Sequence, residues 1–211
     1  MATREEVLGR VRAALVDVPD DEDVEVPRGY RRARPQPEGT VERFRERVAD
    51  YRAVIELVPP AGVAAAVASA LRAVGARRVA VPLGLPGEWT ADAGVELVPD
   101  APPLSVADLD AVDAVLTGSV VGIAETGTIV LESGELCGRR ALSLVPDVHV
   151  CVVRAADVVD DVPAAVARLR PDRPLTWISG PSATSDIELD RVEGVHGPRT
   201  LHVLVVTEGP S

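Results

Sequence analysis

The pattern of apolar residues changes near residue 53 of the chain. Before that point, apolar residues recur every three or four positions in two segments, over residues 1–16 and 41–51, which predicts two short amphipathic helices. The segment between them, residues 17–39, is rich in proline and changes from acidic to basic, which is typical of a linker or arm. We therefore expect an N-terminal helix with a flexible arm over residues 1–39 and a folded domain over residues 40–211.

Beyond residue 53, short apolar runs alternate with segments of helical periodicity. The strands that we predict cover residues 53–58, 77–82, 95–98, 113–118, 126–133, 148–154, 174–180 and 199–207. The helices cover residues 63–74, a short segment over 106–111, and about 161–170. Continuous apolar strands separated by helices are typical of a parallel sheet that is covered on both faces. We predict a three-layer α/β/α fold with a largely parallel sheet, and with the N-terminal helices packed outside it.

The charged residues exclude several classes of function. The chain has 211 residues, with 33 acidic and 22 basic ones, and every basic residue is arginine. Without lysine there is no Schiff-base or pyridoxal-phosphate chemistry on this chain, and no GxxxxGK[ST] phosphate loop. A net charge of −11 and an aromatic content of 2% argue against nucleic acid or an anionic membrane as the main partner.

Cysteine use and apolar segments indicate the compartment. No apolar run near the N-terminus has the form of a secretory signal, and none approaches the length of a membrane span, so we expect a soluble cytoplasmic protein. Cys137 and Cys151 are too few for an iron–sulfur cluster or a cysteine zinc site, and metal-ligand spacings such as HExxH and CxxC are missing. We expect no metal and no cofactor on this chain.

Three loops next to predicted strands carry candidate chemistry, because ligands of open parallel sheets bind beyond the carboxyl ends of the strands. The first is Thr117-Gly118-Ser119, and the second is the glycine- and hydroxyl-rich segment 122–128, which contains Glu125. A carboxylate held there can act as nucleophile or general base. Equally, it can belong to a turn in which Gly127 supplies a positive φ angle.

The third loop, residues 180–188, follows a predicted strand and has the strongest local signal. Ser182, Thr184 and Ser185 offer hydroxyl groups at an expected helix start, and Ser185 has capping-box spacing to Glu188. The amino end of a helix binds phosphate or carboxylate groups through its free N–H groups. The alternative is that these residues merely cap the helix while Asp186 complements its dipole.

The histidines and paired arginines complete the candidates. His196 lies in a glycine-flanked loop, where it suits proton transfer at neutral pH, and Arg199 can pair with a carboxylate or phosphate. His149 and His202 lie within predicted strands, where a core or edge position is the more common role. Arg139–Arg140 connect two strands and can reach an anionic ligand. The GxSxG and GxGxxG motifs are missing, so a nucleophile-elbow hydrolase and a common dinucleotide site lack support.

Three long motifs carry a family resemblance. LTGSVVGIAETGTIVLESG, RRALSLVPDVHVCVV and ISGPSATSDIELDRVEGVHGPRTLHVLVV occur in this order within residues 113–207 and resemble the LUD-domain family, lactate utilization protein C. The resemblance implies a fold like that of glucosamine-6-phosphate deaminase, ribose-5-phosphate isomerase and the coenzyme A transferases. It also implies a part in the oxidation of L-lactate to pyruvate, beside cysteine-rich partner proteins that carry iron–sulfur clusters, with this chain as the cluster-free member.

The analogy with that wider fold places residues 118–119, 125–128 and the 180–188 loop at an anion site, and together with His196 and Arg199 the candidates fall into two groups. The candidate catalytic residues are Glu125 and His196. The candidate anion- or substrate-binding residues are Gly118, Ser119, Thr126, Gly127, Thr128, Gly180, Ser182, Thr184, Ser185, Asp186 and Arg199.

Two hypotheses follow from the resemblance. In the favoured one, the chain is a component of a lactate-oxidising system that binds a small carboxylate or phosphate, or a partner subunit, without turnover of its own. In the other, it is an independent enzyme, similar to coenzyme A transferases or sugar-phosphate isomerases, with Glu125 as the nucleophile.

Overall fold

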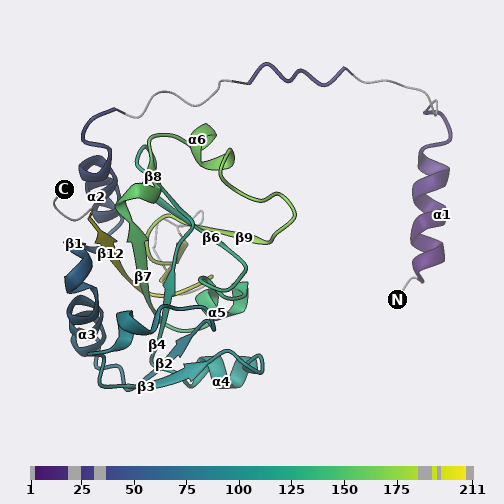
Figure 1. Ribbon diagram of the computed structural model, residues 1–211. Coiled ribbons are helices and arrows are strands. Elements are labelled where there is room, and N and C mark those ends of the chain that lie inside the picture. The colour runs from purple at the N-terminus through teal and green to yellow at the C-terminus, as the bar shows by residue number, and fades with distance from the viewer. Residues whose placement is uncertain (1–2, 19–24, 31–36, 185–191, 194–195, 208–211) are drawn as a thin grey trace. The chain divides into compact units, whose positions relative to one another are not determined.

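The computed structural model describes residues 3–18, 25–30, 37–184, 192–193 and 196–207. The chain divides into two compact units, residues 1–31 and residues 32–211, and we describe each by itself (Figure 1).

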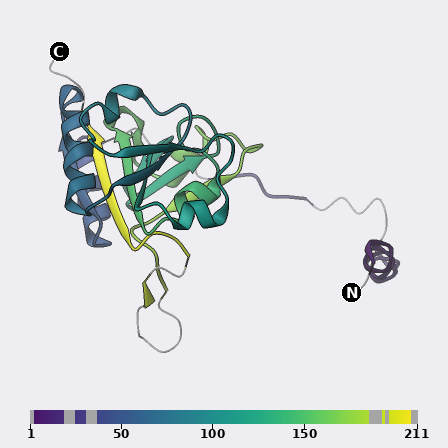
Figure 2. The same ribbon diagram turned by 90° about the horizontal axis from the view of Figure 1, so that it is seen from below.

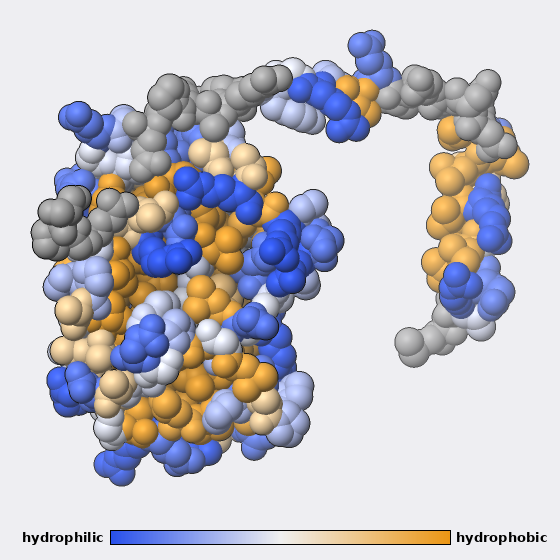
Figure 3. Space-filling model, in the orientation of Figure 1, coloured by the Kyte–Doolittle hydropathy of each residue, from blue (hydrophilic) through white to orange (hydrophobic). Residues whose placement is uncertain are grey.

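The N-terminal unit contains one helix, α1 (Arg4–Ala14), among its described residues. Thr3 and Glu6 form a capping box at its start, in which each side chain accepts a hydrogen bond from the backbone N–H of the other residue. Val7, Val11 and Leu15 are about half exposed. Figure 3 shows apolar side chains along one side of this helix. The helix predicted over residues 1–16 is confirmed.

The second unit is built on a six-stranded sheet in the order β1-β12-β7-β4-β2-β3. Its strands are β1 (Val54–Val58), β2 (Arg78–Val81), β3 (Glu96–Pro99), β4 (Ala114–Gly118), β7 (Val148–Arg154) and β12 (Thr200–Val206). Every neighbouring pair is parallel. The predicted parallel sheet is confirmed, because continuous apolar strands such as β4 and β7 are buried on both faces.

A second sheet of four strands, in the order β8-β5-β6-β9, lies over one face of the first. Its strands are β5 (Val121–Ile123), β6 (Thr128–Glu132), β8 (Val158–Val159) and β9 (Leu175–Ile178). The β5–β6 and β6–β9 pairs are antiparallel. The predicted strands 126–133 and 174–180 therefore exist, but they belong to this second sheet and not to the parallel one. Two further short strands, β10 (Ala183–Thr184) and β11 (Val192–Glu193), pair with each other away from both sheets (Figure 2).

Helices cover the remaining surfaces of the sheets. The α-helices of this unit are α2 (Thr40–Asp50), α3 (Val63–Ala73), α4 (Val106–Asp110), α5 (Arg140–Leu144) and α6 (Val162–Val166). The 3₁₀ helices are η1 (Pro60–Gly62), η2 (Gly87–Thr90) and η3 (Ala155–Asp157). Helix α3 packs on one face of the parallel sheet, whereas the second sheet and α2 pack on the other, and α6 covers the outer side of the second sheet (Figure 1). The helical layer predicted on that second face is thus largely a sheet, and the helix predicted over 161–170 is shorter than expected.

The alternation of side chains along β7 separates two cores. Val150 and Val152 point towards α3, whereas Cys151 and Val153 point towards the second sheet. Neighbouring strand β12 alternates in the same way, because the two strands pair in register. His149 shares the face of Cys151, so the alternation directs this polar residue into the space between the two sheets.

Helix α2 approaches the β5–β6 turn very closely. Gly127 adopts a φ of 61° in this turn, and a Cβ atom built on it would lie 2.7 Å from the carbonyl carbon of Arg47. On the same helix, Phe44 is fully buried against the second sheet. Gly127 is therefore needed both for the backbone conformation of the turn and for the close packing of α2.

We predict that Gly127→Ala lowers the free energy of unfolding by about 2–4 kcal/mol, because it adds a steric conflict to the cost of a left-handed backbone. Gly94→Ala is the matched control: Gly94 has a φ of 63° but open space around its Cβ position. This control should cost only about 1 kcal/mol. Urea unfolding measures both values, and equal losses in the two variants would contradict the role given to the α2 contact.

Candidate functional site

A cavity of about 240 Å³ opens between the two sheets, beside the amino-terminal ends of β7 and β12. The parallel sheet contributes His149 and Leu201 to its wall, and α5 contributes Ser143 and Leu144. Strand β9 and the loops before β12 and after β9 supply the rest: Thr176, Trp177, Ile178, Ser179, Gly180, Pro181, Ser182, His196, Gly197 and Pro198.

This position differs from the predicted one. We expected the site beyond the carboxyl ends of parallel strands, yet the hydroxyl-rich loop after residue 178 leaves β9, which is antiparallel to its neighbour β6. The loop therefore meets the opposite end of the parallel sheet, where β12 begins. A larger and more open hollow, of about 560 Å³, does lie at the carboxyl ends of parallel strands, beside Leu57, Ala155 and Thr207.

Hydroxyl groups give the cavity a polar wall. Ser143, Thr176, Ser179 and Ser182 line it, and no acidic or arginine side chain does so among the described residues. Ser179 ends a chain of hydroxyls that runs outward through Thr128 and then Thr126, with O–O distances of 2.8 and 2.7 Å. The predicted residues Thr126 and Thr128 thus support the cavity without lining it.

Two loops meet at one side of the cavity. The Ser182 backbone N–H donates to the Pro198 carbonyl at 2.8 Å, and the Ser182 Oγ accepts from the His196 backbone N–H at 3.0 Å. The structure therefore brings together three predicted residues, Gly180, Ser182 and His196, in one cavity wall. The His196 side chain is exposed, which leaves its ring free to meet a ligand or solvent.

His149 is the site residue that sequence reasoning placed in the core. It borders the cavity although it is fully buried. Its Nε2 lies 2.8 Å from Thr117 Oγ1, while its Nδ1 has no hydrogen-bond partner among the described residues. Burial lowers the pKa of His149 to about 4, so its ring is neutral at pH 7. The sequence signal was a histidine inside an otherwise apolar strand.

Behind His149, a buried polar chain reaches both cysteines. Thr117 Oγ1 donates to Cys151 Sγ at 3.9 Å, and the Cys151 thiol donates to the Gly118 carbonyl at 3.7 Å. Cys137 donates to the same carbonyl at 3.5 Å. Burial raises the pKa of Cys137 to about 11 and raises that of Cys151 further above its ordinary value, so both remain neutral thiols.

Several predicted site residues hold the fold rather than the cavity. Gly118 provides the carbonyl for both thiols, and Ser119 Oγ donates to the Val152 carbonyl at 3.2 Å. Gly127 admits helix α2, as described above. Gly180 lines the cavity and has a structural role as well, because its φ is 79° and a Cβ atom there would collide with Tyr51.

Glu125 and Arg199 lie apart from the cavity lining. Glu125 is exposed in the turn between β5 and β6, and its backbone N–H donates to the Asp160 carbonyl at 2.9 Å. Arg199 forms a surface ion pair with Asp147 at 3.7 Å. The catalytic role of Glu125 and the anion contact of Arg199 stay predictions.

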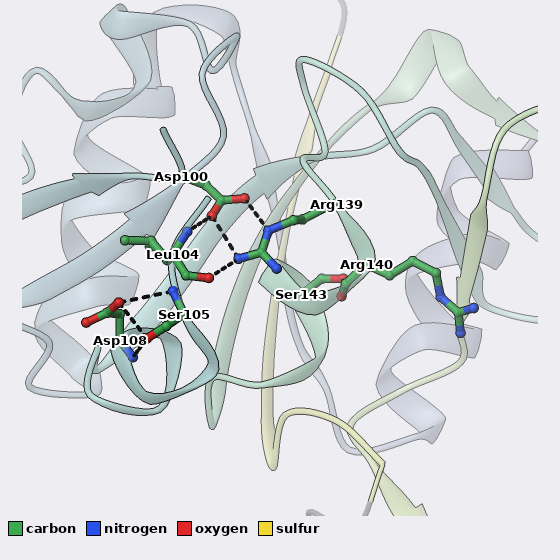
Figure 4. A network of polar contacts seen from close by, with 7 residues as sticks. All are labelled: Asp100, Leu104, Ser105, Asp108, Arg139, Arg140 and Ser143. Carbon is green, nitrogen blue, oxygen red and sulfur yellow. Dashed lines mark hydrogen bonds and ion pairs between the residues drawn. The ribbon is translucent and has the colours of Figure 1, made fainter. Parts of the chain in front are cut away.

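Arg139 precedes α5 and Arg140 begins it, and these two neighbouring arginines differ in their surroundings (Figure 4). Arg139 donates to both carboxylate oxygens of Asp100, at 2.8 and 3.0 Å, and also to the Leu104 carbonyl. Arg140 points away from this network and is exposed. Arg139 therefore ties α5 to the segment after β3, and of the two only Arg140 has a guanidinium without such bonds in Figure 4.

Part of the predicted hydroxyl loop lies outside the described residues, including Ser185, Asp186 and Glu188. Within the described part, Ala183–Thr184 form β10 and pair with β11, whereas the capping-box helix start at Ser185 and Glu188 lies outside the described residues and stays a prediction. Among the described residues, the hydroxyl groups of the loop carry the argument for ligand binding.

The described residues contain neither a group of side chains arranged for a metal ion nor a helix suited to a membrane. No group of three or more His, Cys, Asp or Glu side chains in that part of the chain is arranged to hold a metal ion. Among the same residues, no helix combines the length and apolar character needed to cross a membrane.

Comparison with known proteins identifies relatives for this chain. The LUD domain model matches residues 106–206. The chain is 54% identical over 167 residues to lactate utilization protein C of Deinococcus radiodurans, which covers 77% of both chains. It is 33% identical over 127 residues to lactate utilization protein C of Bacillus subtilis, which covers 56% of this chain but only 49% of that relative.

A solved structure supports the fold. The crystal structure of a DUF162 family protein from Deinococcus radiodurans superposes with a TM-score of 0.68 at 47% sequence identity. The superposition covers 79% of this chain and 96% of that one.

We predict that His149 makes the fold sensitive to acid. Its pKa is about 4 in the folded state and near 6.5 when unfolded, so protons bind the unfolded chain more readily. This contribution to stability is complete above the unfolded value and is lost as the pH falls from about 6.5 to 4, by about 3 kcal/mol in total. Urea unfolding between pH 7 and 4, together with an NMR titration of the ring, measures both effects. A ring that titrates near pH 6.5 in the folded chain would contradict this assignment.

Proposed function

Because the chain belongs to the LUD-domain family of lactate utilization protein C, we propose that it is a component of an L-lactate utilization system. The observation that carries this proposal is the identity of 54% over 77% of both chains with a relative of that name. A match over 167 residues extends far beyond a single motif.

The cavity between the sheets is the proposed ligand site. Its volume of about 240 Å³ lies below the range of about 300–1,000 Å³ usual for drug-sized ligands, which favours a small molecule. Hydroxyl groups, the Ser182–His196 contact and the absence of acidic side chains among its described lining residues favour an anionic one. A small carboxylate, or a phosphate, fits this lining because serine and threonine hydroxyls donate hydrogen bonds without adding charge.

The partners in the proposal are iron–sulfur and cysteine-rich subunits, and the chain itself is cluster-free. Both cysteines are buried, and both thiols donate to the Gly118 carbonyl, which supports a structural role for them. Oxidation of lactate to pyruvate releases two electrons, so a chain without a redox group would work beside proteins that carry one.

We predict that deletion of the gene abolishes growth on L-lactate as the sole carbon source, while growth on glucose is unchanged. Expression of the wild-type chain in the deletion strain should restore growth on lactate. Normal growth of a clean deletion on lactate would overturn the proposal.

The same complementation assay tests the alternative enzyme. Glu125→Gln should restore growth as well as the wild type does, because Glu125 lies exposed on a turn outside the cavity lining. A Glu125→Gln chain that is stable but does not restore growth would favour the carboxylate mechanism similar to coenzyme A transferases.

Purification of a tagged chain from lactate-grown cells should also recover a cysteine-rich protein.

A further inference from the structure

Strand β9 forms an open edge of the second sheet, beside the cavity. In the order β8-β5-β6-β9 it has one neighbour, β6, among the described strands (Figure 1). An unpaired strand edge is a template for another extended chain, and proteins usually block it with charged residues, proline or a bulge. The residues of β9, Leu175–Ile178, include no charged residue and no proline, and they pair with β6 in an unbroken register. The edge is therefore open to a further strand.

The hydrogen bonds between β6 and β9 determine which backbone groups point to this edge. The Ser133 N–H donates to the carbonyl of Pro174, its opposed residue when the register of the pair is continued by one. Opposed residues of an antiparallel pair alternate between hydrogen-bonded and non-hydrogen-bonded positions. Thr176 and Ile178 therefore bond to β6, whereas the backbone N–H and C=O of Trp177 point away from it. These two groups of Trp177 receive no hydrogen bond from any residue that the structure describes.

The open edge meets the cavity at Trp177. The cavity wall includes residues 176–182 without a gap. Trp177 lies opposite Val130, which packs in the outer core with α6, so the Trp177 side chain stands on the outer face of the sheet. A residue with its side chain on that face borders a cavity between the sheets through its backbone at the edge. The unpaired N–H and C=O of Trp177 are therefore part of the cavity wall.

A donor and an acceptor side by side select the kind of ligand. The N–H of Trp177 suits a carboxylate oxygen, but the neighbouring C=O repels one. A peptide backbone offers an acceptor and a donor together, which is the basis of recognition by strand addition. The cavity, at about 240 Å³, is too small for a helix, which measures about 10–12 Å across with its side chains. The end of a single extended chain fits it best.

The far wall of the cavity determines which end of that chain enters. The loop 180–182 directly follows β9 and is bonded to the loop 196–198, because Ser182 N–H donates to the Pro198 carbonyl and His196 N–H donates to Ser182 Oγ. A chain docked along β9 must end at this wall. The described lining residues include no acidic side chain to hold an amino terminus, whereas the Ser182 hydroxyl keeps its own proton for a carboxylate.

We propose that the edge of β9 and the cavity together bind the carboxyl-terminal segment of another protein chain. The segment adds to β9 as a parallel strand, and its terminal carboxylate lies at Ser182. This inference rests on the anion site of the proposed function and deepens it, because it names the molecule that carries the carboxylate. A component of a multi-protein system would in this way hold the tail of a partner subunit.

The test compares three probes by NMR titration of the full-length chain at pH 7: N-acetyl-trialanine with a free carboxylate, the same peptide as its amide, and L-lactate. We expect the free acid to bind about tenfold more tightly than the amide, because the amide loses a charge-assisted hydrogen bond. L-lactate has no peptide backbone to pair with β9, so it should bind about tenfold more weakly than the free peptide.

Two substitutions separate the backbone of Trp177 from its side chain. Trp177→Pro removes the unpaired N–H and leaves the bonds to β6, because proline is tolerated on an edge strand where its nitrogen faces away from the neighbouring strand. It should lower the affinity for the free peptide about tenfold. Trp177→Val is the matched control, since it removes the same side chain but keeps the N–H, and its affinity should equal that of the wild type.

Amide hydrogen exchange of the wild-type chain tests the geometry without any variant. The Trp177 amide should exchange much faster than the amides of Thr176 and Ile178. Addition of N-acetyl-trialanine should protect the Trp177 amide, whereas addition of L-lactate should not.

Several outcomes would overturn the inference. These are equal binding of the free peptide and its amide, equal affinities of Trp177→Pro and Trp177→Val, or a Trp177 amide that is protected in the free chain. Binding of L-lactate without binding of the peptide would also overturn it, and would leave the small-acid site of the proposed function standing. Normal growth of the deletion strain on lactate would instead remove the proposed role in lactate utilization, whatever the peptide titration shows.

Discussion

The face-to-face packing of the two sheets is the constraint on which the rest of this domain depends. Cys151 and Val153 from β7, and Val203 and Val205 from β12, form a shared core with the second sheet and helix α2. The packing is closed where these apolar residues meet. It opens where the same strand faces carry His149 instead, at the amino-terminal ends of β7 and β12, and that opening is the cavity.

The core between the two sheets is closed to water on both sides, so its polar groups form hydrogen bonds with one another. A threonine hydroxyl, an imidazole and two thiols would each lose hydrogen bonds to water on burial, and the structure compensates by joining them into a chain that ends at the Gly118 carbonyl. One atom of the chain, His149 Nδ1, lacks a partner among the described residues. Thr117 and Gly118 at the carboxyl end of β4 belong to this chain, so the buried polar groups gather along the strand segments that lead from the cavity wall to the Gly118 carbonyl.

Much of the fold could be predicted from the sequence, because the period of the apolar residues reports local structure. The strands of the parallel sheet, α2 and α3 all lie within a few residues of their predicted positions. The second sheet was missed, since an apolar run such as residues 128–132 looks the same whether its neighbours are parallel or antiparallel. The three-residue strand β5 and the two-residue strand β8 are too short for any period to show.

The candidate site was predicted only in part, for the same physical reason. Gly180, Ser182 and His196 were found because loops rich in glycine and hydroxyls stand out in a sequence, and the structure places them in one wall. His149 was not, because its role depends on a distant segment: only the pairing of β6 with β9 brings Ser179 and its loop to the strand that carries this histidine. For Gly127 the sequence offered a ligand contact or a turn with a positive φ, and the structure shows the turn, with α2 packed against it. Gly180 lines the cavity and also packs against Tyr51.

The absence of lysine limits the cationic side chains that an anion site on this chain can use. With only arginine as a permanent cation, a site for an anion would ordinarily be expected to hold a guanidinium, yet the arginines nearest in sequence are engaged elsewhere or exposed. A cavity that receives an anion through hydroxyls alone binds it weakly, because neutral donors stabilise a charge less than an ion pair does. Such a site gains selectivity from shape and from single polar atoms rather than from charge.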